Sequence, residues 1–540
     1  MPPQPEKRRR IPPNRLLALR LLSSYMRLFL SRMKRGLTIL LLLLLALPVR
    51  AERINHEGRI LGALPAVTNA VLFNTTNADA VLAAMQIFPP TNPWNEDISQ
   101  RPVLPNSDAM IAQIMADLAA SRRTLRVFKE MNFVLVPDNQ PTLPINFVDY
   151  PDESDLDGGT FPNGLYPIPT NMPIETWPSE TGGLTLQQWQ QDVNSDGGDR
   201  HAILVQPGNG FIREMWQAKL VSGNWESSNG AKFNLNTNGL RPAGWTSGDA
   251  AGLPMFPALV RFDECERGAV EHAMRIVVAK SRKEYIYPAT HYASTLTGTN
   301  YPAMGQRVRL KSSFAIPANW TKQEKAMLTA LKKYGALVAD NGGFFSISVT
   351  PDDRWPAVCF DHLNTVGITN FEVIQTTSAI QGPRSPGAPV ANAGADQSAF
   401  VGVPMPLHGF VSFTNTYPTT IQWKRYSGPT NLTFTSTSQT NSTVTFTASG
   451  VYTLMLSASN AVHAVAYDAV IITVSPVITM TATKSGPNLN LSWSGGTPPF
   501  VIERATNFPV TSWSSALTTS VQSASFPIIP GQAFFRIRGN

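Results

Sequence analysis

Histidine is scarce in this chain, and its distribution points to chemistry. Of seven histidines, three fall in one part of the sequence: His201, His272 and His291. Asp249 lies between the first two. A histidine beside a carboxylate can transfer a proton near neutral pH. We predict that His201, Asp249, His272 and His291 face one cleft as catalytic residues; the alternative is that each histidine is a hydrogen-bonded core or strand-end residue.

The segment LRPAGWTSGDAAGLP (240–254) contains too many glycines and prolines for a regular element. It carries Arg241 and Trp245, and an indole can stack on the apolar face of a sugar while a charged group bonds the hydroxyls. Asp263 and Glu264 follow and could supply a carboxylate for glycoside cleavage. We predict that Arg241 and Trp245 bind a polysaccharide substrate; the alternative is a buried structural loop with Trp245 in the core.

Two acidic turns that contain glycine are candidate calcium sites. The first places Asp192, Asn194 and Asp196 at alternate positions before a glycine, and residues 153–158 have a similar pattern. Alternating carboxylates on a tight turn direct oxygen atoms toward one hard cation. The twelfth residue from Asp192 is Ile203, so the closing glutamate of a helix–loop–helix calcium hand is missing. We predict a simpler calcium-stabilised loop, against the alternative of an acidic, solvated turn.

The charge distribution and the motif content exclude several classes of protein. The net charge is +7, but residues 1–51 hold eleven Lys/Arg and one acid, which leaves 33 basic and 36 acidic residues in the rest of the chain. A mature protein with this balance has no electrostatic reason to bind nucleic acid. Phosphate-binding loops and zinc-protease motifs are missing from the sequence. Cys265 and Cys359 are too few for a cysteine-rich zinc site and either pair or remain free thiols.

Residues 33–51, MKRGLTILLLLLLALPVRA, have the pattern of a secretory signal peptide. Two basic residues precede an apolar stretch of 11 residues, which is short for a membrane span of about 20. We predict cleavage near Glu52, export to the cell surface or the extracellular space, and no membrane contact after cleavage. The alternative is an uncleaved signal anchor. Whether translation begins at Met1 or Met33 stays open.

Residues 52–375 have the pattern of one mostly-β module with peripheral helices. Short apolar runs between Gly, Pro and Asn turns predict strands at 201–206, 211–221, 274–279 and 285–293. Helix signals occur at 74–88, 107–118 and 321–335, and the last begins with a capping box of Thr321 and Glu324. Residues 137–200 lack periodicity, which indicates a long loop that is functional or partly disordered. Arg307, Arg309 and Lys311 alternate and predict a solvated strand face.

After a Ser/Pro/Gly linker at 376–389, the composition shifts to Thr, Ser and Val, as half-buried sandwich strands require. Residues 390–474 resemble the polycystic-kidney-disease (PKD) repeat over their whole length. The matching stretches are VANAGADQ (390–397), IQWKRYSGP with Trp423, SGVYTL (449–454) and SASN (457–460). We expect Trp423 to fill the core, and Tyr452 to alternate with Leu454 and Leu456 on an inner strand. The resemblance implies a seven-stranded, immunoglobulin-like sandwich at 390–475 that serves as a spacer or adhesion module without catalysis.

Two further resemblances complete the domain organisation. Residues 476–540 resemble a fibronectin type III module, another immunoglobulin-like sandwich, through LNLSWSGGTPPFVIERATN with Trp493 and the closing FFRIRGN. The segment is shorter than usual members of that family. In the N-terminal module, GDRHAILV, LRPAGWTSGDAAGLP and VEHAMRIVV are similar to an uncharacterised family of exported bacterial proteins, over most of 88–375. That similarity implies a single exported module and transfers no activity.

These features favour two functions from different classes. The first is a polysaccharide-active hydrolase or lyase whose C-terminal sandwiches are spacers. The second is a non-catalytic adhesin, carbohydrate-binding protein or structural protein of the cell envelope. A convergent histidine or carboxylate cluster in an open cleft would favour the enzyme, whereas a binding surface without perturbed acids would favour the second function.

Overall fold

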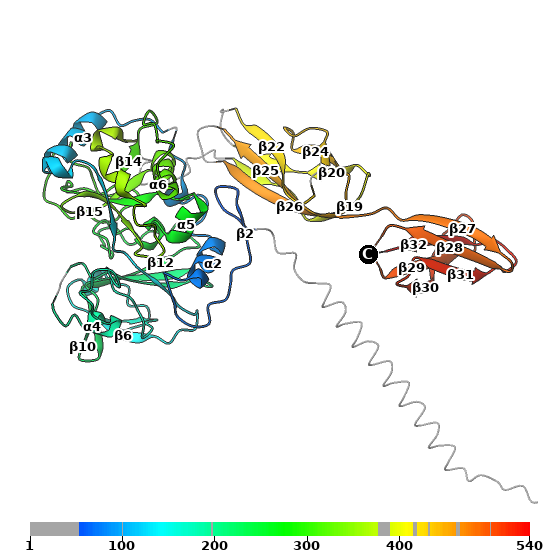
Figure 1. Cartoon of the computed structure of the whole chain (residues 1–540), viewed down its shortest axis with the longest axis horizontal. Helices are drawn as coiled ribbons and strands as arrows, with labels where there is room; N and C mark the ends of the chain where they lie inside the picture. Colours follow the sequence, from blue (N-terminus) through cyan, green and yellow to red (C-terminus); the bar gives the residue numbers. More distant parts are fainter. Residues whose placement is uncertain are drawn as a thin grey trace, which may run out of the picture. The chain divides into compact units, whose positions relative to one another are not determined.

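The computed structural model describes residues 53–99, 101–195, 198–375, 389–413, 418–429, 432–460, 465–496 and 498–539 (Figure 1). The predicted leader at 1–51 and almost all of the predicted linker at 376–389 lie outside these residues. The fold class is mostly β, as predicted. Two immunoglobulin-like sandwiches follow the N-terminal module. Within the described ranges, none of the helices is both long enough and apolar enough to cross a membrane.

The N-terminal module is built around a five-stranded sheet of β3 (Val71–Leu72), β5 (Val134–Leu135), β8 (Ala202–Gln206), β9 (Phe211–Trp216) and β12 (Asn229–Asn234). Their order is β12-β9-β8-β5-β3, and only β5 and β8 run parallel. Ile203 and Val205 enter one hydrophobic core, whereas Leu204 enters another. Both faces of this sheet are buried, and β5 and β8 read as almost continuous apolar runs, whereas β9 and β12 carry buried polar residues such as Glu214 and Asn229.

Two outer sheets cover the central one. The first contains β4 (Leu125–Lys129), β13 (Met274–Val278), β14 (Arg307–Leu310), β15 (Ala336–Asn341), β16 (Phe345–Val349) and β17 (Phe371–Val373), in the order β17-β14-β15-β13-β16-β4. The second contains β6 (Leu143–Phe147), β7 (Asn163–Tyr166), β10 (Lys219–Val221) and β11 (Asn224–Ser227), in the order β10-β11-β6-β7. The first shares a core with Ile203 and the second with Leu204. A separate ribbon pairs β1 (Arg53–Ile54) with β2 (Ile60–Leu61).

Short helices connect the sheets: α2 (Thr76–Ala84), α3 (Ser107–Ala116), α4 (Leu186–Gln190), α5 (Phe262–Arg267) and α6 (Lys322–Lys333). Single 3-10 turns are η1 (Pro93–Asn95), η2 (Ala120–Arg122), η3 (Pro151–Glu153), η4 (Phe256–Ala258), η5 (Asp361–Thr365) and η6 (Ile368–Asn370). The capping box predicted for α6 is confirmed: the Glu324 N–H donates to Thr321 Oγ1 (3.1 Å), and the Thr321 N–H donates to the Glu324 carboxylate (2.9 Å). Helix α2 ends at Ala84, because Met85 is extended.

Three sequence predictions about the elements of this module differ from the structure. The run 211–221 is two strands, β9 and β10, which belong to different sheets. The range 137–200 is no single loop, since it contains β6, β7 and α4. The run 285–293 forms no strand: the Ala289 N–H donates to Ile286 O (2.9 Å) in a turn. Pro288 has no N–H for a strand ladder, which accounts for the break.

The next module is a sandwich of β18 (Val390–Asn392), β19 (Gln397–Phe400), β20 (Met405–His408), β21 (Phe410–Ser412), β22 (Thr420–Ser427), β23 (Leu432–Phe434), β24 (Asn441–Phe446), β25 (Gly450–Ser459) and β26 (Ala466–Ser475). A four-stranded sheet, β19-β26-β25-β22, faces a three-stranded sheet, β20-β24-β23, and β18 pairs with β21. Trp423, Tyr452, Leu454 and Leu456 fill the core between them, as predicted.

The last module has six strands: β27 (Thr479–Ser485), β28 (Asn488–Ser494), β29 (Phe500–Ala505), β30 (Ser514–Thr519), β31 (Ser523–Pro527) and β32 (Phe534–Arg538). They form two three-stranded sheets, β27-β28-β31 and β30-β29-β32. The fully buried core is small and consists of Leu491, Trp493, Phe500 and Ile502. This module therefore has the two-sheet architecture expected from its sequence, with Trp493 in the core.

Candidate functional site

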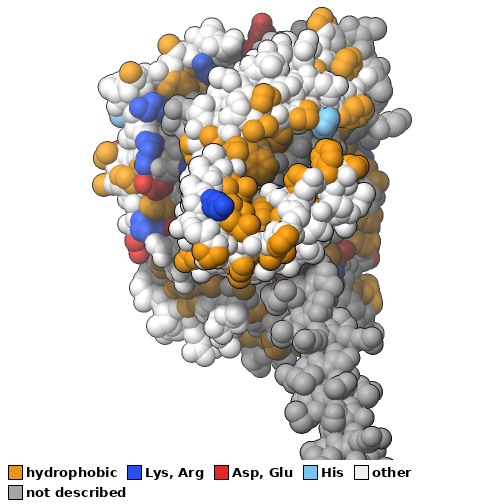
Figure 2. All heavy atoms as spheres, turned by 90° about the vertical axis from the view of Figure 1, so that its right-hand side faces the viewer, with side chains coloured by type: hydrophobic (Ala, Val, Ile, Leu, Met, Phe, Trp, Pro, Cys, Tyr) orange, Lys and Arg blue, Asp and Glu red, His pale blue; other side chains and the backbone are white. Residues whose placement is uncertain are grey.

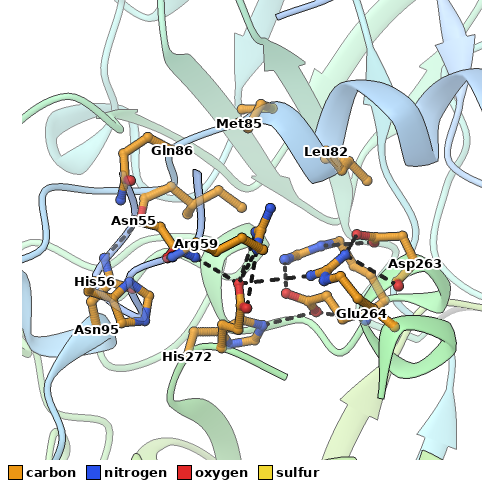
Figure 3. Close-up of a pocket in the computed structure, with 14 residues that line it drawn as sticks. Asn55, His56, Arg59, Leu82, Met85, Gln86, Asn95, Asp263, Glu264 and His272 are labelled. Atoms are coloured by element: carbon orange, nitrogen blue, oxygen red, sulfur yellow. Dashed lines mark hydrogen bonds and ion pairs between the residues drawn. The ribbon is translucent and has the colours of Figure 1, made fainter. Parts of the chain in front are cut away.

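Charged side chains from the β1–β2 ribbon, α5 and the segment after α5 line a small cavity, with α2 above it (Figure 3). We call it the Glu264 pocket; its ionisable residues are His56, Arg59, Arg261, Asp263, Glu264, Arg267, Glu271 and His272. The space open to solvent-sized molecules is about 30 Å³. Since one water needs roughly 10–15 Å³ of such space, the pocket holds about two waters.

Glu264 is the centre of this pocket. The Arg261 guanidinium pairs with its carboxylate, and His272 Nε2 lies 3.2 Å from Oε2. Burial alone would raise the pKa of Glu264, but Arg261 and His272 outweigh that effect and hold the pKa at about 2. Glu264 is therefore ionised at any physiological pH, and it fixes the orientation of His272.

The neighbouring carboxyl group of Asp263 has the opposite tendency. Burial raises its pKa, and the negative charge of Glu264 raises it further. Arg267 Nη1 donates to Oδ2 at 3.0 Å, while Oδ1 accepts no hydrogen bond from the described residues. Two adjacent acids with opposite pKa shifts are the arrangement that separates a proton donor from a carboxylate. The pocket can therefore support acid–base chemistry, but its volume is large enough for water and too small for a sugar ring.

The remaining charges of the pocket are paired. Arg59 Nη2 lies 2.9 Å from Glu271 Oε2, and Asn55 Nδ2 donates to the same oxygen at 2.8 Å. Three arginines, Arg59, Arg261 and Arg267, thereby balance three acids, Asp263, Glu264 and Glu271. This balance leaves no excess charge to attract an ionic ligand.

Of the four predicted catalytic residues, only His272 lines this pocket. Asp249 is buried elsewhere: its two carboxylate oxygens accept from Arg275 Nη2 (2.7 Å) and Nε (2.9 Å). His291 is partly exposed, with Nδ1 2.7 Å from the Ala250 carbonyl and its ring stacked on Tyr292. The expectation that these residues face one cleft does not match the structure.

His201 lies at the start of β8, where the Glu175 carboxylate accepts its backbone N–H at 3.2 Å. The imidazole is almost fully buried, and its Nδ1 meets no hydrogen-bond partner among the described side chains and backbone. Its charged neighbours include Glu130 and Glu214. His201 thus belongs to a buried charge cluster in the module, together with Asp249 and Arg275. None of the five cavities described for this module is lined by His201, Asp249 or His291.

The residues predicted to bind sugar have a structural role. Arg241 is buried, donates to the Thr246 carbonyl (2.7 Å) and the Glu153 carbonyl (2.6 Å), and pairs with Asp155. Its guanidinium lies 5.4 Å from the half-buried ring of Trp245. These contacts tie the 240–254 segment to the turn after β6, as the alternative of a structural loop predicts for Arg241, whereas Trp245 is half-buried and lies outside the core clusters.

Side-chain cations pair with aspartates in both acidic turns. In the turn at 153–158, Asp155 pairs with Arg241, and Asp157 pairs with both Arg213 and Lys232. In the other turn, Asp192 pairs with Arg200 at 3.3 Å, Asn194 is exposed, and Asp196 lies outside the described residues. Across the ranges that the structure describes, no three His, Cys, Asp or Glu residues are grouped as metal ligands would be. Cys265 and Cys359 are buried free thiols.

The buried cluster gives a pH prediction for this module. Burial raises the pKa of Glu214 to about 7, although the backbone N–H groups of Phe256 and Met255 donate to it. Burial and Asp249 likewise raise the pKa of Asp340 to about 7. Both acids bind protons more tightly in the folded state, so the stability that they contribute is fully present below about pH 4 and is lost as pH rises through 7. For Glu214 the loss is roughly 3 kcal/mol, at about 1.4 kcal/mol per pKa unit.

Urea unfolding at pH 5 and pH 8 measures this effect. The denaturation midpoint of the N-terminal module is expected to be lower at pH 8, and Glu214→Gln should reduce the difference between the two pH values. Glu264 does not contribute to this difference between pH 5 and pH 8. Because its pKa is about 2 in the folded state, the stability that it provides is lost only at a pH below this window. A midpoint that rises between pH 5 and pH 8 would contradict the prediction.

A larger, open hollow lies on the four-stranded sheet, with a volume of about 490 Å³. Its lining comes from β6, α4, β10, β11 and the segment after β7: Leu143, Pro144, Pro169, Thr170, Gln187, Gln190, Leu220, Gly223, Asn224 and Trp225. We call it the neutral hollow, because no lining residue is charged. Gln190 is fixed in its wall, since Nε2 donates to the carbonyls of Thr170 (3.1 Å) and Met172 (2.8 Å). Six of the ten lining residues come from the range 137–200, which lacks periodicity, and the other four come from residues 220–225, so no local signal in the sequence marks this site.

Comparison with known proteins places no family on the chain. No family model matches it, and no curated protein does. Among solved structures, a solution structure of a PKD domain aligns with 19% of this chain and 99% of its own, at 20% identity and TM-score 0.15. A mutated three-domain fragment of titin aligns with 29% of this chain and 62% of its own, at 12% identity and TM-score 0.20. The first eight immunoglobulin domains of the Down syndrome cell adhesion molecule align with 28% of this chain and 27% of their own, at 16% identity and TM-score 0.18.

Proposed function

We propose that this chain is a non-catalytic, carbohydrate-binding protein of the cell surface, whose N-terminal module binds a neutral glycan. The observation that carries the proposal is the composition of the neutral hollow. Its volume of about 490 Å³ lies within the range of roughly 300–1,000 Å³ typical of ligand sites. Amides, one hydroxyl and one indole line it, and no ionisable group does.

This lining suits sugar hydroxyls better than charged ligands. The amide side chains of Gln187 and Asn224 are exposed, and each can donate and accept a hydrogen bond. Leu143 and the partly exposed Leu220 provide apolar area for the carbon face of a sugar ring, whereas Trp225 is 6% exposed and packs in the core. Glycoside cleavage needs a pair of carboxylic groups, which this hollow does not contain. Binding without cleavage is therefore the activity that the lining supports.

The C-terminal sandwiches fit the role of spacers or adhesion modules. From residue 390 onward the chain has only three acids, Asp396, Asp468 and Glu503, and six Lys/Arg. Figure 2 shows a face on which uncharged side chains predominate. The presence of these modules supports export and surface attachment. This support comes from which types of domain occur together in the chain and not from a mechanism.

Removing the exposed amides tests the proposal. Gln187→Ala and Asn224→Ala should each weaken binding of a neutral oligosaccharide about fivefold, because each deletes a hydrogen bond worth about 1 kcal/mol. The change is measured by calorimetric titration with an oligosaccharide derived from a neutral polysaccharide that binds the native chain. Gln191→Ala is the matched control: the residue is an exposed amide at the end of α4 that does not line the hollow. The assignment would be refuted if all three variants bound the oligosaccharide with the affinity of the native chain, or if Gln191→Ala weakened binding as much as the other two.

The Glu264 pocket supports a second candidate function, acid–base catalysis of hydrolysis. The opposite pKa shifts of Asp263 and Glu264 favour it. Its water-sized volume ranks it below glycan binding, because a substrate must first open the pocket. Release of sugar from a polymer by the native chain, lost in Asp263→Asn with glycan binding retained, would establish this candidate instead.

A further inference from the structure

A second large hollow lies at the free edge of the central sheet. Its volume is about 660 Å³, and it is lined by the continuous segment 65–72, by the start of α2 and by Asn171. The α2 side chains that line it include Asn77, Ala80 and Val81. No Asp, Glu, Lys, Arg or His belongs to the lining. The hollow therefore accepts an uncharged ligand, and its chemistry differs from that of the Glu264 pocket.

The backbone beside this hollow has unused hydrogen-bonding groups. Strand β3 (Val71–Leu72) is the last strand of the sheet order β12-β9-β8-β5-β3, so one of its edges pairs with β5 and the other is open. The preceding residues, 63–70, form no backbone hydrogen bond within the part of the chain that the structure describes. An open strand edge next to unpaired N–H and C=O groups is a template for another extended peptide.

The chain itself carries a strand that fits this template. All seven residues of β27 (Thr479–Ser485) are exposed, and Lys484 is the single charged one. β27 is the outer strand of the order β27-β28-β31, so its far edge is open as well. Its seven pairs with β28 run without a register break, which leaves a regular edge. The similar edge strand β30 has a break opposite Ile502 and Glu503, a feature that twists an edge away from pairing.

We infer that this hollow is a docking site for β27 of a second copy of the chain. The β27 strand would add to the open edge of β3, and its uncharged side chains, mainly threonine, alanine and methionine, would enter the uncharged hollow. The donor and acceptor surfaces are different parts of one chain, so the interface is heterologous. A heterologous interface that does not close into a ring produces head-to-tail chains of molecules, a form suited to a surface protein.

Sedimentation of residues 52–540, the second compact unit of the chain, tests the inference. The weight-average mass is expected to rise with concentration beyond that of a dimer. Ala80→Lys places a charged side chain in the hollow while keeping a good helix former in α2, so it blocks the acceptor surface alone. Thr481→Lys/Ala482→Lys charges both faces of β27, so it blocks the donor surface alone. Each variant by itself should remain monomeric.

Mixing the two variants gives the decisive result. One keeps its donor strand and the other keeps its acceptor hollow, so an equimolar mixture should form a 1:1 dimer that cannot grow. Ala112→Lys on α3 is the matched control, an exposed helical alanine outside the hollow, and it should assemble like the native chain. Unchanged melting temperatures confirm that the variants are folded. A native chain that stays monomeric at all concentrations, or a mixture that forms no dimer, would overturn the inference.

Discussion

Replacing Asp249 by Ala is expected to lower the free energy of unfolding of the N-terminal module by about 3–5 kcal/mol, the cost of breaking a buried ion pair on one side. The Asp249 and Arg275 side chains are 1% and 4% exposed. Without Asp249, the guanidinium retains a hydrogen bond to Ser348 Oγ at 2.9 Å and a weak contact with Asp340 at 3.9 Å. Those partners do not replace two charged hydrogen bonds, so the Arg275 charge is left poorly compensated. Urea unfolding at pH 7 measures the loss.

A double-variant cycle separates this ion pair from simple loss of packing. Asp249→Ala combined with Arg275→Met removes both charges, so the two losses should be clearly less than additive. The exposed pair of Lys322 and Glu266, 3.0 Å apart, supplies a control, because Lys322→Ala removes a pair whose side chains are 48% and 40% exposed and should cost about 1 kcal/mol or less. Additive losses in the cycle would mean that the pair contributes nothing as a pair.

The second large effect is expected in the PKD-like sandwich, where Trp423→Ala should cost about 3–5 kcal/mol. The indole is 1% exposed and packs in the core with Tyr452 and Leu456. Its Nε1 donates to the Thr440 carbonyl at 3.2 Å. Neighbouring backbone is shaped around it, since a Cβ on Gly409 would lie 2.7 Å from the indole. Because truncation leaves a cavity that this rigid backbone cannot fill, chemical unfolding of a 390–475 fragment should show a large shift.

Phe410→Ala is the matched control for this substitution. Phe410 is an aromatic residue of the same sandwich, on β21, but it is 61% exposed, so its truncation should change stability by less than about 1 kcal/mol. The fragment itself should unfold cooperatively, because its core residues all come from its own strands. A fragment without a cooperative transition would show that the sandwich depends on the rest of the chain.

The sequence predicted the elements whose signals are local. The apolar run at 201–206 became β8, the run at 274–279 became β13, and the capping box of α6 formed as expected. In the C-terminal sandwiches, Trp423 and Trp493 occupy cores as their positions in alternating strands implied. Periodicity and capping depend on neighbours in the chain, so they can be read from a single sequence.

Pairings between distant segments could not be predicted, and they determine the site. Arg307 and Arg309 were expected on a solvated face, yet both are buried, where Arg307 binds the Tyr334 carbonyl and Arg309 binds Glu372. Asp249 was expected beside a histidine and instead binds Arg275 of β13. Strand order decides which charge meets which, and alternation along one strand carries no information about it. From the sequence alone, arginines and acids that form buried pairs therefore cannot be distinguished from catalytic or solvated residues.

The most direct test of the central claim is to incubate residues 52–540 with a panel of neutral and acidic polysaccharides. Retention on each polymer and release of new chain ends are measured in the same samples. Binding in an uncharged hollow without carboxylates predicts retention on at least one neutral polymer, weaker retention in Gln187→Ala, and no new ends. Two results would contradict the claim. One is that the native chain produces new chain ends and Asp263→Asn does not; the other is that the native chain is retained on none of the neutral polymers.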